Sequence, residues 1–135
     1  MNAQETRNYS EITDDIYELA ELTSAYSKID PALYSKYDVK RGLRDLDGSG
    51  VLAGLTSVSE VTAKELVNGK LVPCDGRLYY RGINVSDLTN ACLSEGRPGF
   101  EEAVYLLLFG NLPNQSQLKS FNKLLGSYRS LLLHL

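Results

Sequence analysis

The amino-acid sequence predicts a mainly α-helical protein with a small β-hairpin and short strands in its middle. Apolar residues recur at helical spacing towards both ends of the chain. Between them, two β-type runs flank an Asp-Gly dipeptide, which is typical of a tight turn. Hydrophobic residues make up 43% of the 135 residues and charged residues 23%, so we expect one folded domain with its own core.

The N-terminal part of the chain is expected to form two helices. Asn8 with Glu11 three residues later has the form of a capping box, which predicts the start of a helix. The apolar residues that follow at helical spacing are Ile12, Ile16, Leu19, Leu22 and Tyr26. A second, short helix is predicted after Asp30, which can act as N-cap, with Pro31 at the first helical position.

The middle of the chain, residues 51–82, is expected to hold short strands. β-branched residues alternate with small ones over residues 51–61, which favours a strand. Residues 71–82 are interpreted as a hairpin that turns at Asp75-Gly76. Because a hairpin of two short strands is marginal in water, we expect it to pack on the helices.

Two helices are predicted after the hairpin. Ser86 can cap a helix over residues 86–93, which the Gly and Pro of "SEGRPG" bring to an end. The next helix is predicted over residues 99–109, with Gly110 at its C-terminal stop. Its apolar residues run nearly all round the helix, so we expect it to be buried on most sides at the centre of something larger.

The last predicted helix covers residues 114–133. Asn114 with Gln117 repeats the capping pattern at its start. Its apolar face consists of Leu118, Phe121, Leu124, Leu125, Tyr128 and Leu132. The sequence stops inside this apolar pattern, so we expect a chain that has been cut short. A leucine-rich end should seek a partner, either a missing C-terminal part or another copy.

The charge pattern does not favour a nucleic-acid-binding protein. The net charge is −3, and 14 basic residues are scattered among 17 acidic ones, whereas a surface that follows phosphates needs clustered Lys and Arg. The densest basic spot is interrupted by two aspartates and consists of Lys36, Asp38, Lys40, Arg41, Arg44 and Asp45. We interpret this spot as a solvated face rather than as an anion site.

The sequence also favours a cytoplasmic protein without a membrane span. Met1 is followed by polar residues instead of a basic segment and an apolar run, so no secretory signal is visible. No apolar run approaches the roughly 20 residues that a membrane-spanning helix needs. Cys74 and Cys92 form no CxxC pair, so we expect two reduced, structural thiols and no zinc.

One stretch has the opening of a calcium-binding loop. Its oxygen ligands, turn glycine and aliphatic residue match at Asp45, Asp47, Ser49, Gly50 and Leu52. The twelfth position holds Thr56 instead of the bidentate Glu, and the following residues favour a strand rather than a helix. We therefore favour a Gly-rich turn that enters a strand over a calcium site.

Two further residues are candidates for functional groups. His134 is the only histidine and could act as a general base, but it has no partner nearby in the sequence, so we favour chance placement or a packing role. Arg81 follows Tyr79 and Tyr80, an arrangement that could stack nucleic-acid bases in a basic groove. The chain lacks such a groove, so we predict that Arg81 makes a side-chain or carbonyl contact at the end of a strand.

Four stretches, in their order and spacing, resemble the N-terminal part of citrate synthases. They are "GVLAGLTSVSEV" from Gly50, "GRLYYRGINVSDL" from Gly76, "FEEAVYLLLFGNLP" from Phe100 and "NQSQLKSF" from Asn114. The matching positions are Gly50, Val51, Thr56, Leu78, Tyr80, Arg81, Gly82, Asp87, Leu88, Glu101, Glu102, Leu106, Leu107, Gly110, Leu112 and Pro113. The resemblance implies that residues 1–40 are a helical N-terminal extension and that residues 41–135 are a truncated N-terminal part of the large domain in an all-helical fold.

The resemblance also implies a function for the whole protein. Citrate synthases condense acetyl-CoA with oxaloacetate to citrate in the tricarboxylic acid cycle, as homodimers and without a metal or other cofactor. Their catalytic aspartate and histidines lie beyond the point that matches Leu135, so no catalytic, cofactor-binding or metal-binding residue is assigned to this chain. We expect the chain to be inactive alone. The alternatives are a piece of a 2-methylcitrate synthase and a helical assembly module that pairs through its apolar helix faces.

Overall fold

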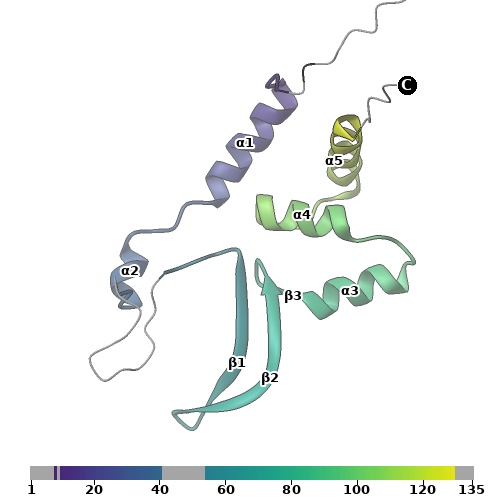
Figure 1. The fold of residues 1–135 in the computed structure, drawn as a ribbon. Coiled ribbons are helices and arrows are strands. Elements are labelled where there is room, and N and C mark those ends of the chain that lie inside the picture. Colours follow the sequence, from purple (N-terminus) through teal and green to yellow (C-terminus); the bar gives the residue numbers. More distant parts are fainter. Residues whose placement is uncertain (1–7, 9, 41–53, 130–135) are drawn as a thin grey trace, which may run out of the picture.

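The computed structural model describes residue 8 and residues 10–40 and 54–129. These residues form five α-helices and one antiparallel sheet of three strands (Figure 1). In chain order the elements are α1 (Asp14–Tyr26), α2 (Ala32–Lys36), β1 (Ser59–Val67), β2 (Lys70–Tyr80), β3 (Ile83–Asn84), α3 (Val85–Ser94), α4 (Phe100–Phe109) and α5 (Gln115–Tyr128). The prediction of a helix-rich protein with a small β element is therefore confirmed for the described residues.

The first helix begins later than its sequence predicted. Thr13, in an extended conformation, is the N-cap of α1. The side chain of Asn8 instead accepts a hydrogen bond from the amide of Ser10 at 3.1 Å, so the predicted capping box at Asn8 is wrong. An Asn side chain that bonds the backbone two residues on forms a local turn, which competes with helix capping. At α2 the N-cap is Pro31, one residue later than predicted, although the Asp30 side chain still accepts a hydrogen bond from the amide of Ala32 at 2.9 Å.

The hairpin turns at a different dipeptide from the one predicted. β1 and β2 are joined by Asn68-Gly69, and both turn residues have positive φ, 49° and 75°. A two-residue loop of this kind matches the twist of the flanking strands. The predicted turn at Asp75-Gly76 is wrong, because both residues lie inside the continuous strand β2.

The hairpin of β1 and β2 extends away from the helices, and we call residues 59–78 the β arm (Figure 1). Its apolar side chains are largely exposed: Val61 at 77%, Leu66 at 70% and Leu71 at 68%. Among the described elements, the main contact between the sheet and a helix is that of α3 with β2 and β3 at the base of the sheet. The expected packing of the hairpin on the helices is thus limited to its base. Of the predicted strand over residues 51–61, residues 51–53 lie outside the described residues. The prediction is wrong for residues 54–58, because β1 begins only at Ser59.

The three C-terminal helices begin and end at local signals. Asn84, not the predicted Ser86, is the N-cap of α3, because Asn84 ends β3 in an extended conformation and its side chain accepts a hydrogen bond from the Ser86 amide. The predicted stop of α4 at Gly110 is confirmed, with φ at 84°. The predicted capping box of Asn114 and Gln117 is also confirmed, with both hydrogen bonds at 2.9 Å. The helix ends at Tyr128, and residues 130–133 of the predicted helix lie outside the described residues.

The helical core lies where α1, α4 and α5 meet. Tyr105, Phe109 and Phe121 pack edge to face, with ring centroids 4.5 to 5.8 Å apart. Such pairs contribute about 0.5–1.5 kcal/mol each beyond the area that they bury. Leu106 on α4 is also fully buried, whereas Leu108 on the same helix is 43% exposed. Apart from Phe100 and Leu108, every residue of α4 is buried or half-buried, which agrees with the predicted burial of this helix on most sides.

Candidate functional site

Arg81 joins three parts of the chain that are distant in sequence. It directly follows β2 and has a φ of 49°, and its amide donates a hydrogen bond to the Val58 carbonyl at 2.9 Å. Its guanidinium donates to the Leu107 carbonyl through Nε at 3.2 Å and through Nη2 at 2.9 Å. Nη1 donates to the Tyr26 carbonyl at 3.2 Å and to the Ser57 hydroxyl at 2.9 Å. The prediction that Arg81 makes carbonyl or side-chain contacts is confirmed.

Two of these acceptors belong to helix C-termini. Tyr26 is the last residue of α1, and Leu107 lies in the last turn of α4. Carbonyls in a last helical turn have no partner within the helix, and a cation there also interacts favourably with the helix dipole. One guanidinium thus satisfies carbonyls at the ends of two helices and holds both against the end of β2.

A close approach of two residues completes this arrangement. Gly110 has a left-handed conformation, and a Cβ atom on it would lie 2.6 Å from a ring carbon of Tyr26. A residue with a side chain would therefore push the Tyr26 ring away and would also be strained at this φ. We call Arg81, Tyr26, Ser57, Leu107 and Gly110 the Arg81 corner.

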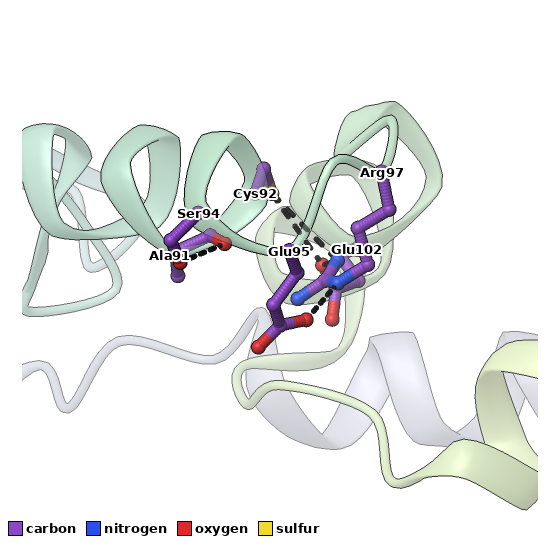
Figure 2. A network of polar contacts seen from close by, with 6 residues as sticks. All are labelled: Ala91, Cys92, Ser94, Glu95, Arg97 and Glu102. Carbon is purple, nitrogen blue, oxygen red and sulfur yellow. Dashed lines mark hydrogen bonds and ion pairs between the residues drawn. The ribbon is translucent and has the colours of Figure 1, made fainter.

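A second polar network joins the end of α3 to the start of α4. Figure 2 shows Arg97 between Glu95 and Glu102, with ion pairs to both carboxylates. The hydrogen bonds to Glu95 and then to Glu102 raise the pKa of Arg97 above its usual value. The Sγ of Cys92 lies 3.7 Å from Nη1 of Arg97, in a contact that also appears in Figure 2. Because Gly99 packs against this Sγ, there is no room for a side chain at position 99.

The chemical capacity of the described residues is limited. Among residues 8, 10–40 and 54–129, no group of three or more His, Cys, Asp and Glu side chains is placed to hold a metal ion. His134 and the calcium-like residues 45–52 lie outside the described residues. In the basic spot, Lys40 forms an ion pair with Asp38 at 2.7 Å. Arg81 and Arg97 are engaged by protein groups, so both act as structural cations here.

Two open apolar hollows flank α4, and sequence reasoning missed both. The first, of about 360 Å³, lies between α1, α4 and α5, and its lining includes Ile16, Leu19, Val104, Phe121, Leu124 and Leu125. The second, of about 450 Å³, lies between α3 and α4, and its lining includes Tyr80, Val85, Leu88, Cys92, Leu93 and Ala103. The helical spacing of these residues was the available signal, but spacing alone does not tell a filled face from an open one.

None of the helices in the described ranges combines the length and the apolar character that crossing a bilayer requires.

Comparisons with known proteins identify related sequences. A family model described as citrate synthase, C-terminal domain, matches residues 45–135. The chain is 39% identical over 97 residues to 2-methylcitrate synthase 1 of Corynebacterium glutamicum, which is 72% of this chain and 20% of that relative. It is 40% identical over 94 residues to 2-methylcitrate synthase 2 of the same organism, or 70% of this chain and 19% of the relative.

A third relative is the 2-methylcitrate synthase of Mycobacterium tuberculosis, 31% identical over 93 residues, or 69% of this chain and 18% of the relative. The chain therefore spans about a fifth of the length of the curated relatives that it matches. No solved structure matches the chain.

Proposed function

The chain belongs to the citrate synthase family, and we propose that it supplies scaffold to a longer enzyme that condenses an acyl-CoA with an oxo acid. The observation that supports this role is the Arg81 corner. Its residues Arg81, Leu107 and Gly110 are among the positions that match the family, and their contacts serve to hold helices and strand together. Scaffold residues of this kind position a site that other segments complete.

We propose 2-methylcitrate as the product of the longer enzyme. The relatives at 39% and 40% identity bear the name 2-methylcitrate synthase. 2-Methylcitrate has one methyl group more than citrate, so its acyl donor has one carbon more than acetyl-CoA, which is propionyl-CoA when oxaloacetate is the other substrate. Citrate, formed from acetyl-CoA, is the second candidate, because the four quoted stretches resemble citrate synthases.

The place of this chain within the longer enzyme is also a proposal. The order of the four stretches favours the N-terminal part, whereas the matched family model is described as a C-terminal domain. We further propose that the longer enzyme is a cytoplasmic homo-oligomer that pairs through apolar helix faces. The apolar hollow between α1, α4 and α5 supports the last point, since it leaves apolar side chains uncovered.

A chimera tests the scaffold role. The segment of 2-methylcitrate synthase 1 of C. glutamicum that matches this chain is replaced by the chain's own residues, and release of the CoA thiol from propionyl-CoA and oxaloacetate is measured. We expect a folded, active chimera and no release above background by the 135-residue chain alone. A chimera that folds but lacks activity would contradict the scaffold role, and turnover by the chain alone would contradict its expected inactivity.

The choice of acyl group needs a separate measurement, because the chimera takes its acyl-binding residues from the host. The complete gene product is assayed with propionyl-CoA and with acetyl-CoA. A higher kcat/KM for propionyl-CoA is expected, and a higher kcat/KM for acetyl-CoA would favour citrate formation instead.

A further inference from the structure

We propose that the outer edge of β1 pairs with β1 of a second copy of this chain, antiparallel and with Thr62 of one copy opposite Thr62 of the other. The pairing would join two β arms into one continuous sheet of the order β2-β1-β1-β2. It uses a surface other than the apolar helix faces, and it does not depend on the proposed enzymatic function.

The edge of β1 is open in the described part of the chain. In the sheet order β1-β2-β3, β1 has β2 on one side and no described strand on the other (Figure 1). An unpaired edge presents N–H and C=O groups that can pair with another strand. β1 offers nine residues for this purpose, more than the usual five or six of a strand.

The free edge of β2 is protected, whereas that of β1 is not. Pro73 lies in β2 and has no N–H to donate. Thr62 pairs with Arg77 and Lys64 pairs with Pro73, so three residues of β2, numbers 74–76, face Ala63 alone. These extra residues form an irregularity on β2, while β1 runs uninterrupted over Ser59–Val67 without Pro or Gly. Bulges and prolines are features that keep strands from adding to an edge, so β1 is the edge left open.

The charges of β1 select a self-pairing register. Glu60, Thr62 and Lys64 alternate along the strand and so point to one face, where the Thr62 hydroxyl donates to Glu60 at 3.0 Å. When Thr62 faces Thr62 of a second copy, residues equally far from it lie opposite each other. Glu60 then faces Lys64 of the other copy, and Lys64 faces Glu60. Opposite charges across an antiparallel pair stabilise it, and this register forms two such pairs.

Neighbouring registers lose these pairs. Hydrogen-bonded and non-hydrogen-bonded pairs alternate along an antiparallel ladder, so the next possible registers are centred on the residues next to Thr62. The register centred on Ala63 places Glu60 opposite Leu66 of the other copy and Lys64 opposite Thr62. The register centred on Val61 places Glu60 opposite Thr62, so neither register brings opposite charges together. In the register centred on Thr62, the exposed Val61 also lies opposite Ala63, which covers part of its apolar surface.

The β arm also has a physical reason to seek a second copy. A two-stranded ribbon is at best marginally stable in water, and a sheet of four strands is more stable. The arrangement has two-fold symmetry, so each copy provides the same surface, as in most homodimers.

Charge reversal tests the proposal on the 135-residue chain by sedimentation equilibrium. We expect the unchanged chain to dimerise, and we expect Glu60→Lys or Lys64→Glu alone to weaken the dimer roughly tenfold, because each reversal creates two like-charge pairs. The double variant should recover the dimer. An equimolar mixture of the two single variants should form heterodimers, since one copy then supplies two lysines that face two glutamates of the other. Glu65→Lys is the matched control, because Glu65 faces Ser59 in this register and its reversal should change little.

Three results would overturn the proposal. The first is that the unchanged chain is monomeric. The second is that neither single reversal changes the dissociation constant of the dimer, which would place the contact on the helices instead. The third is that the two single variants fail to associate when mixed. A reversal that simply unfolds the β arm is recognised by circular dichroism, and mixing two unfolded variants would not restore association.

Discussion

The two ends of β2 are stabilised in opposite ways. At its C-terminal end, Arg81 contacts carbonyls 26 and 55 residues away, in helices that also meet in the aromatic core. At its other end, the β arm is held by backbone pairing to its neighbour in sequence, and its apolar side chains face solvent. Contacts between distant segments therefore stabilise the helical part, whereas the β arm depends on local pairing and on whatever covers it.

The largest expected effect is the loss of an aromatic ring from the core. Phe121→Ala removes a buried side chain that contacts Tyr105 and Phe109, and we expect the free energy of unfolding to fall by about 3–5 kcal/mol. Val61→Ala removes a side chain from the β arm and should cost well under about 1 kcal/mol, because Val61 is already exposed. Urea unfolding followed by circular dichroism measures both, and equal losses would refute the contrast between the two regions.

An intermediate effect is expected at the Arg81 corner. Arg81→Ala leaves the Leu107 and Tyr26 carbonyls without their charged donor, and we expect a loss of about 2–3 kcal/mol in the free energy of unfolding. Arg81→Lys keeps the charge but cannot make two bonds to one carbonyl, so it should lose less than Arg81→Ala.

Arg77 provides the matched control on the β arm. Its ion pair to Glu65 spans 3.7 Å between half-exposed side chains, so Arg77→Ala should cost less than about 1 kcal/mol. A loss at Arg77 as large as that at Arg81 would show that the β arm contributes to stability as the corner does.

The smallest expected effect is on the free energy of unfolding at low pH. The hydrogen bond from Arg129 lowers the pKa of Glu101 below its ordinary value of 4.5, so the unfolded chain binds more protons than the folded chain in that range. The resulting stabilisation is complete above the ordinary value and is lost as the pH falls through the lowered pKa. We therefore expect the difference in unfolding free energy between the unchanged chain and Glu101→Gln to shrink as the pH is lowered from neutral.

The control for this measurement is Glu65→Gln on the β arm. Because the ion pair of Glu65 with Arg77 is longer, Glu65→Gln should change the unfolding free energy little at neutral pH. A difference between the unchanged chain and Glu101→Gln that grows as the pH falls would contradict a stabilising ion pair of Glu101 with Arg129.

Signals within a few residues of each other predicted the helix boundaries best. Asn114 with Gln117 and the stop at Gly110 were correct because the side chain or the conformation of the residue itself forms the cap. The hairpin turn was misplaced because two X-Gly dipeptides compete in this segment. Asn68-Gly69 is the one whose flanking residues, Val67 and Lys70, pair directly.

The Arg81 corner could be predicted only in outline. A strand-end arginine was expected to contact a carbonyl, but every residue has a carbonyl, so nothing in the sequence singles out those of Tyr26 and Leu107. The left-handed conformation of Arg81 could not be predicted either, because such a conformation is uncommon outside Gly, Asn and Asp. The network of Arg97 with Glu102 likewise depends on the angle between two helices, which spacing in the sequence does not give.

The thiol of Cys92 can report whether the hollow between α3 and α4 is covered, because Cys92 is half-buried and lines that hollow. A reagent that alkylates Cys92 has to place its added group in the hollow, since the backbone at Gly99 leaves no room on its own side. The labelling rate should therefore fall when another segment or a partner fills the hollow. Cys74 in β2 provides a thiol for the same measurement on the β arm.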